Sequence, residues 1–255
     1  MEIKSIVEKL SYSAVRSYCT SPALFWKHYV MKEHFVPSLT MLTGKAWHRG
    51  LEEYYRGNND YVGIGVETLV KGYDEVLDAT PREKTQDLGV KFKKEIELLK
   101  ENLEAYPEME RNWEPSDIIE RKIVMPSPVE GGLPISGIAD ILEKGGSPID
   151  HKYVGRKNNG DMSKHMIQAW FYYHLVKHET GKYPAYFMIS EFKKVKNRDG
   201  SPQLTERVLE YEDKWVKRID QFFKEICEQI LGQKHFLPNP FNIFQDDDWK
   251  SYLND

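Results

Sequence analysis

The sequence is poor in cysteine. Its 255 residues include only Cys19 and Cys227, which lie far apart and form no CxxC pattern. This scarcity argues against a disulfide framework and against a cluster held by four thiolates. We therefore expect both thiols to be buried and inert.

A long hydrophobic run and the common nucleotide-binding motifs are also missing. No stretch of about 20 apolar residues is present, which excludes a transmembrane helix. The first ten residues lack the apolar segment of a secretory signal, so we expect a cytoplasmic protein with no membrane partner. Neither a GxGxxG nor a Walker sequence occurs, which argues against a dehydrogenase or an NTPase.

A strong overall charge is absent as well, since the formal net charge is −4. The charge is unevenly distributed, because residues 151–200 contain ten Lys or Arg and four Asp or Glu. Such a basic segment suits a polyanionic substrate, although a lysine-rich stretch is also typical of a solvated face.

The patterns that are present predict a single α/β domain over residues 1–255. We divide it into N-terminal helices (11–56), a helical insertion (57–116), an α/β core (117–232) and a tail (233–255). Alternating apolar residues predict strands at 117–125, 133–142, 147–154, 185–193 and 203–211. Amphipathic spacing predicts the remaining elements as helices, including 43–55, 162–178 and 215–231. The expected core is a small mixed sheet flanked by helices.

Two of the predicted strands carry chemically active residues. Asp140 follows Gly137-Ile138-Ala139, and Asp150 follows Pro148-Ile149 after a turn. Carboxylates that converge from neighbouring strands are oxygen ligands for a hard divalent cation. Lys152 lies two residues after Asp150 and therefore on the same face of its strand. A cation with an ammonium group beside it is what hydrolysis of a phosphodiester requires.

Four segments together resemble the signature of a known family. The order and spacing of Gly44–His48, Gly137–Asp140, Asp150–Lys152 and Gln168–Tyr172 are similar to those of RecB-like nucleases of the PD-(D/E)XK superfamily. The helical start from Tyr12 to Tyr29 is also similar, so the resemblance covers nearly the whole chain. It implies a restriction-endonuclease-like core and a metal-dependent DNA nuclease, more specifically an exonuclease.

The resemblance also implies the roles of the central residues. His48, Asp140 and Asp150 would be ligands of Mg²⁺ or Mn²⁺, and the backbone carbonyl of His151 would be a further one. Lys152 would orient the attacking water and stabilise negative charge on the phosphate.

Other residues are expected to contact the substrate or to support the ligands. Gln168 and Tyr172 share one face of a helix, and they would bind either the DNA backbone or the active-site carboxylates. Arg156 and Lys157 are further candidates for binding DNA. Glu120 would lie behind the metal ligands and contact them, or else belong to a solvated strand edge.

Helix packing leads to three more expectations. Gly44 lies one turn before His48 and is expected to let its helix approach the sheet closely. Trp170 is expected in the core. His174 and His178 have the spacing of a zinc pair but no third ligand, so we expect them at a solvent-facing helix end.

Many RecB-like nucleases carry an iron–sulfur cluster, with one cysteine in the early helices and three near the C-terminus. Here Cys19 lies in the early helices, but the three later cysteines are absent and residues 241–252 stand in their place. We therefore expect no iron–sulfur cluster. Packing of Phe241, Phe244, Trp249 and Tyr252 against the N-terminal helices is expected to replace it.

Two alternatives remain open. A nucleic-acid-binding module could retain this fold without catalysis, although it would not need the whole set of His48, Asp140, Asp150 and Lys152. An RNA-directed nuclease would have the same site. The sequence leaves open the polarity of digestion, the oligomeric state and the context, be it DNA repair, recombination or degradation, in a phage or a mobile element.

Overall fold

The computed structural model describes residues 6–156 and 162–237. Its helices are α1 (Tyr12–Thr20), α2 (Pro22–Phe25), α3 (Leu39–Tyr55), α4 (Tyr61–Asp78), α5 (Thr85–Ala105), α6 (Met166–Thr180) and α7 (Asp213–Gly232). A π-helical turn, η2 (Trp26–Val30), continues α2, and short 3₁₀ turns lie at Arg82–Lys84, Tyr106–Glu108 and Ser163–His165. Within the described part of the chain, no helix is long and apolar enough to cross a membrane.

Local sequence signals explain where several helices begin and end. The side chains of Ser11, Ser21 and Ser38 each accept a hydrogen bond from a backbone N–H in the first turn of α1, α2 and α3. Pro22 occupies the first turn of α2, where its missing N–H costs nothing. Gly181 adopts the left-handed conformation, with φ of 78°, and ends α6.

One mixed sheet contains all the described strands. These are β1 (Leu10–Ser11), β2 (Pro115–Met125), β3 (Ile135–Glu143), β4 (Pro148–Val154), β5 (Tyr186–Lys193) and β6 (Leu204–Glu210). The order along the sheet is β1-β3-β4-β5-β6, and β2 pairs with β3 in addition. Strands β1 and β3 are parallel, as are β4 and β5, and the other pairs are antiparallel.

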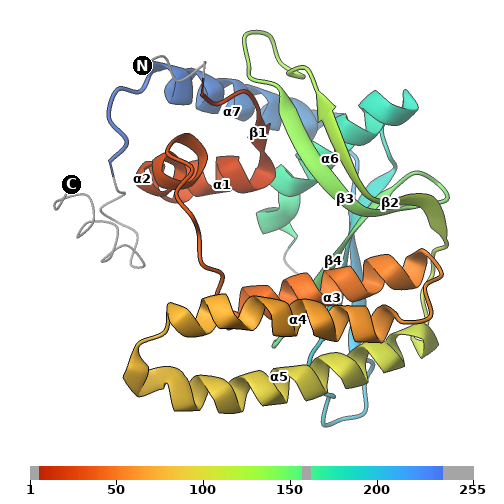
Figure 1. Cartoon of the computed structure of the whole chain (residues 1–255). Coiled ribbons are helices and arrows are strands. Elements are labelled where there is room, and N and C mark those ends of the chain that lie inside the picture. Colours follow the sequence, from red (N-terminus) through yellow and green to blue (C-terminus); the bar gives the residue numbers. More distant parts are fainter. Residues whose placement is uncertain (1–5, 157–161, 238–255) are drawn as a thin grey trace.

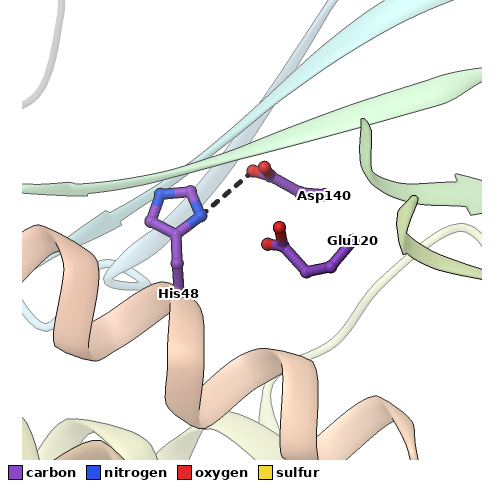
Figure 2. A group of neighbouring side chains, drawn as sticks. All are labelled: His48, Glu120 and Asp140. Atoms are coloured by element: carbon purple, nitrogen blue, oxygen red, sulfur yellow. Dashed lines mark ion pairs between the residues drawn. The ribbon is translucent and has the colours of Figure 1, made fainter. Parts of the chain in front are cut away.

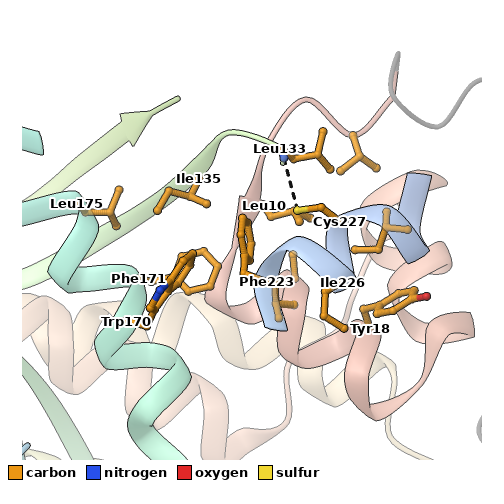
Figure 3. Close-up of a cluster of buried hydrophobic side chains, with 14 of the residues drawn as sticks. Leu10, Tyr18, Leu133, Ile135, Trp170, Phe171, Leu175, Phe223, Ile226 and Cys227 are labelled. Carbon is orange, nitrogen blue, oxygen red and sulfur yellow. Dashed lines mark hydrogen bonds between the residues drawn. The ribbon is translucent and has the colours of Figure 1, made fainter. Parts of the chain in front are cut away.

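Helices cover both faces of this sheet (Figure 1). Helices α1, α6 and α7 pack around Trp170, Phe171 and Phe223, which are almost fully buried (Figure 3). Removing such large apolar side chains from water is the main source of stability for this layer. Trp170 therefore lies in the core, as the sequence predicted.

Helices α3, α4 and α5 form a second layer, which Figure 1 shows side by side below the sheet. Trp47 of α3 is fully buried and stacks on Tyr153 of β4, with ring centroids 4.6 Å apart. Gly50 and Gly65 lie where α3 crosses α4, and a Cβ at either would come within 2.8 Å of Leu103. These glycines permit the close approach of α3, α4 and α5 to one another. The prediction that Gly44 lets α3 approach the sheet closely was wrong, because a Cβ on Gly44 would meet nothing within 4 Å.

Most predicted elements match the observed ones within a few residues, but several details were wrong. The strand β1 was missed, and α3 begins at Leu39 rather than near Thr43. Cys19 is exposed, whereas Cys227 is buried as expected. The expectation for the tail residues 241–252 falls outside the described residues.

His174 was also predicted wrongly, because it is buried rather than solvent-facing. Its Nε2 lies 3.1 Å from Oδ1 of Asp220, which also accepts a hydrogen bond from the indole of Trp170. The imidazole thus joins α6 to α7 through a carboxylate that the helix pattern alone does not reveal.

Candidate active site

The central strand β3 pairs with β2 along one edge, with one shift in register between Pro115 and Ile119, and its other edge is interrupted. β2 occupies the first edge from Met125 to Pro115. On the other edge, the register pairs join β3 to β1 at Ile135 and Ser136, and to β4 at Ile141 and Leu142. Among the described residues, no strand is in register with residues 137–140 on that side. The Gly137–Asp140 motif therefore lies in a gap between β1 and β4.

Asp140 uses this gap to reach β4. Its Oδ2 accepts a hydrogen bond of 2.8 Å from the backbone N–H of His151. A side-chain carboxylate thus satisfies a donor on β4 beyond the last register pair with β3, which a buried backbone group requires. The bond holds Asp140 beside the residues that follow on β4.

His48, Glu120 and Asp140 come together from three different elements. His48 projects from α3 toward Asp140 of β3, and Glu120 of β2 lies beside them (Figure 2). One ligand atom from each of the three residues lies within 4.8 Å of the other two. The distance between His48 Nδ1 and Asp140 Oδ2 is 3.2 Å.

Glu120 has an unusual backbone at this point. Its φ of 47° places it in the left-handed region, which is rare for a residue with a side chain and costs roughly 1–3 kcal/mol. The register pairs Ile119↔Ile141 and Arg121↔Ala139 flank it, so Glu120 lies opposite Asp140 across the two strands. Two carboxylates in such a position repel each other.

The pKa values of the three groups reflect this crowding. Burial, together with the charge of Asp140, raises the pKa of Glu120 to about 7. Burial alone would raise the pKa of Asp140, but His48 outweighs it, with help from Lys152, and the result is a pKa of about 2. Burial opposes the charged form of His48, and Asp140 more than compensates and raises its pKa. The imidazole and Asp140 thus form an ion pair, and Glu120 forms no salt bridge with a described residue, although the charges of His48 and Arg56 partly offset the rise in its pKa.

Asp150 and Lys152 form a second group on the α6 side of β4. The ammonium Nζ of Lys152 lies 2.6 Å from Oδ2 of Asp150. Gln168 of α6 donates a hydrogen bond of 2.8 Å to the other oxygen, Oδ1. Burial opposes the charge of Lys152, but Asp150 and Asp140 outweigh it and raise its pKa, so the ammonium stays charged at neutral pH.

The structure thus divides the ligands predicted from the sequence. It brings His48 and Asp140 together, but the third member of their group is Glu120, not Asp150. Asp150 points to Lys152 and Gln168 instead. Its buried position and the charge of Asp140 raise its pKa despite Lys152. Ligation of a metal by Asp150 therefore stays a prediction. Glu120 lies closer to His48 and Asp140 than the sequence suggested.

His151 contributes its backbone rather than its ring. The side chain points to the other face of β4 and stacks on Tyr55, with ring centroids 5.7 Å apart. Burial lowers its pKa to about 3, so the imidazole is neutral. Ligation by its carbonyl stays a prediction.

A pocket of about 470 Å³ opens beside Asp150 and Lys152. Gln168 and Tyr172 of α6 form part of its wall, and Gln168 contacts the carboxylate, one of the two options that the sequence left open. The hydroxyl of Tyr172 donates a hydrogen bond of 2.8 Å to the carbonyl of Ile138, inside the gap of β3. Arg156 is exposed just after β4, and Lys157 falls outside the described residues.

The sequence reasoning missed part of this pocket. Arg16 of α1 and Lys122 of β2 also line it, together with Ser136 of β3. The only available signal for Lys122 was the pairing of the predicted strands 117–125 and 133–142. Nothing in the pattern of α1 indicates that Arg16 faces the site, because that depends on β1.

The comparisons with known proteins agree with this geometry. A model of the PD-(D/E)XK nuclease superfamily matches residues 9–242. A proposed exonuclease from Eubacterium rectale, with a crystal structure at 2.19 Å resolution, has a TM-score of 0.58 and 12% sequence identity, over 94% of this chain and 87% of that one. This likeness concerns the fold.

A second solved structure, that of SSO0001, has a TM-score of 0.31 and 13% identity, over 89% of this chain and 87% of that one, which is too low to support an argument. None of the curated proteins compared with the sequence matches it. The family model, however, covers most of the chain and includes every residue of the site described above. The chain belongs to the PD-(D/E)XK nuclease superfamily.

Proposed function

We propose that this nuclease is a Mg²⁺- or Mn²⁺-dependent enzyme that hydrolyses phosphodiester bonds in DNA, and that it acts as an exonuclease. The observation that carries the proposal is the pair of opposed carboxylates, Glu120 and Asp140, with an imidazole and an ammonium group close by. Repulsion between two carboxylates is costly in a site that serves only the fold. In a site that binds a divalent cation, the positive charge of the cation offsets this repulsion, and both carboxylates can serve as ligands.

The residues present fit a divalent cation. His48, Glu120 and Asp140 offer one nitrogen and two carboxylates within 4.8 Å, a donor set that suits Mg²⁺ or Mn²⁺. Nucleases of this superfamily generally use divalent metals. Such an ion supplies a Lewis acid that activates water and offsets charge on the phosphate. Asp150 is the proposed fourth ligand.

The other groups of the site prepare the substrate for attack. Lys152 holds its ammonium group beside Asp150, where it can orient a water molecule and stabilise the negative charge that develops on the phosphate. Its raised pKa makes it a poor general base, so an orienting and electrostatic role is proposed. Gln168 fixes the position of Asp150 and thereby that of the ammonium group.

DNA is the proposed substrate, and its ends are the proposed point of attack. The basic segment at 151–200, including Arg156, lies next to the site in the sequence and suits a phosphate backbone. The similarity in fold to a proposed exonuclease supports the proposal that the enzyme attacks DNA ends. Cytoplasmic DNA repair, recombination or degradation, also in a phage or mobile element, is the proposed context.

Incubation of the purified protein with end-labelled linear DNA, circular DNA and RNA, with Mn²⁺ or with EDTA, tests the proposal. We expect shortening of linear DNA with Mn²⁺ alone. Asp140→Asn should abolish cleavage and remove Mn²⁺ binding in calorimetry. Cleavage of RNA in preference to DNA would favour an RNA-directed nuclease. Binding of DNA without cleavage of any substrate would instead favour a non-catalytic binding module.

A further inference from the structure

The pocket beside Asp150 and Lys152 carries more positive charge than the catalytic pair requires. Its charged lining residues are Arg16, Lys122, Lys152 and Asp150. Asp150 and Lys152 neutralise each other through their contact of 2.6 Å. The other two cations are exposed and form no salt bridge with a described residue, whereas the neighbour of Lys122, Arg121, pairs with Glu179. The pocket therefore has two positive charges available.

Two further features of the wall favour an anion. Ser136 is only 8% exposed, lines the pocket and uses its hydroxyl in no hydrogen bond with a described residue. The first turn of α1 also faces the pocket through Tyr12 and Ser13, and it contains no acidic residue. The first N–H groups of a helix lack partners within the helix and favour negative charge.

The size and charge of the pocket indicate which anion it would take. Its volume of about 470 Å³ is that of a site for a small ligand rather than for a continuing duplex. A phosphate monoester carries about two negative charges at neutral pH, whereas each phosphodiester of a continuous strand carries one. Two available cations match the monoester.

We propose that Arg16 and Lys122 bind the terminal phosphate of a nucleic-acid chain, in the pocket beside Lys152, and so direct the enzyme to phosphorylated ends. This inference rests on the proposed nuclease function of the adjoining site. Arg16 can bind two phosphate oxygens at once, since the guanidinium fork matches their geometry. Lys122 adds a point charge, and Ser136 supplies a donor.

Metal-free binding separates this inference from catalysis. In EDTA, fluorescence anisotropy is measured with short single-stranded oligonucleotides that carry a 5′-phosphate, a 3′-phosphate or neither, each labelled at the opposite end. We expect one phosphorylated end to bind about tenfold more tightly than the hydroxyl end, as for a charge-assisted hydrogen bond. Arg16→Gln and Lys122→Gln should each remove most of that preference.

Matched controls are available on the exposed surface. Arg82→Gln and Lys214→Gln change the same residue types at exposed positions outside the pocket, and they should keep the preference. With Mn²⁺, Arg16→Gln should raise KM for phosphorylated ends more than it lowers kcat, because Arg16 is proposed to hold the terminal phosphate, whereas Lys152, which lines the same pocket, is the group proposed to act on the phosphate that is cleaved.

Three results would overturn the inference or separate it from the nuclease proposal. Equal affinity of the parent for all three oligonucleotides would refute a terminal-phosphate site. Equal weakening of all three by Arg16→Gln would mean that the pocket holds an internal phosphodiester, which also refutes it. A strong end preference in a protein that cuts no nucleic acid would support the pocket and refute the nuclease.

Discussion

Replacement of Glu120 by glutamine should stabilise the metal-free protein at neutral pH. In the folded chain its carboxyl pKa rises from 4.5 to about 7, which corresponds to at most about 3 kcal/mol. The side chain is partly exposed, so screening by solvent reduces the gain to roughly 1 kcal/mol. For a domain of this size, that raises Tm by about 2–4 °C.

The sign of the pH dependence follows from the direction of the shift. A carboxyl group whose pKa is higher in the folded state binds more protons there, so folding stability falls as pH rises from 4.5 to about 7. Above a pH of about 7, Glu120 is ionised in both states, and the loss of folding stability stays constant. The advantage of Glu120→Gln should therefore be absent near pH 4, grow up to about pH 7 and then level off.

Addition of Mn²⁺ should make the parent protein more stable than Glu120→Gln and so reverse the order of their Tm values. A ligand at 100 times its Kd stabilises the folded state by about 2.7 kcal/mol. The parent should gain this increment, whereas Glu120→Gln, with one carboxylate fewer, should gain little. Thermal unfolding at pH 4, 6 and 8, in EDTA and in Mn²⁺, measures both effects.

Glu130→Gln is the matched control, since Glu130 is an exposed carboxylate between β2 and β3. It should change stability by less than about 0.5 kcal/mol in either condition. Two results would refute the conclusion that Glu120 and Asp140 repel each other without a cation and bind one together. One is a lower Tm for Glu120→Gln than for the parent in EDTA at pH 8, and the other is an increase in Tm with Mn²⁺ as large as that of the parent.

The remaining predictions concern Lys152, the hydrogen bond from Gln168 to Asp150, and the helical layer. Lys152→Ala should lower the cleavage rate by about 10²–10³ and leave Mn²⁺ affinity in calorimetry nearly unchanged; a near-parental rate would remove Lys152 from the mechanism. Gln168→Ala leaves an oxygen of buried Asp150 without its partner and should cost about 1–3 kcal/mol in denaturant unfolding, with slower cleavage. Trp47→Ala removes the ring stacked on Tyr153 and should cost about 3–5 kcal/mol, and a loss below 1 kcal/mol would contradict its place in the core.

Much of the fold was predictable because the periodicity of this sequence is regular. The alternating segments around Asp140 and Asp150 predicted two strands, and these form the antiparallel pair β3 and β4. The spacing of Gln168 and Tyr172 predicted one helix face, and both line the pocket. These inferences need only local geometry, which the order of residues determines.

The rest of the site depends on tertiary contacts that no local pattern contains. Glu120 approaches Asp140 because of strand register and a left-handed backbone, and neither follows from the residue type. Asp150 turns to Lys152 and Gln168 because the ladder between β3 and β4 stops one residue earlier. A reader of the sequence sees two acidic residues in neighbouring strands but not the gap that separates them.

The shortest of the described strands explains why α1 lies against the pocket. β1 has two residues and pairs with β3 at Ile135 and Ser136, immediately before the gap. The strand leads directly into α1, so the pairing holds Tyr12 and Arg16 against the pocket that Gly137 and Ile138 of the gap also line. Had β1 been longer, it would have paired with Gly137–Asp140 and closed the site; without it, α1 would have no fixed position on the pocket. The interrupted edge of β3 thus has the proposed cation ligand Asp140 at one end and, at the other, the proposed phosphate pocket, which Lys152 also lines.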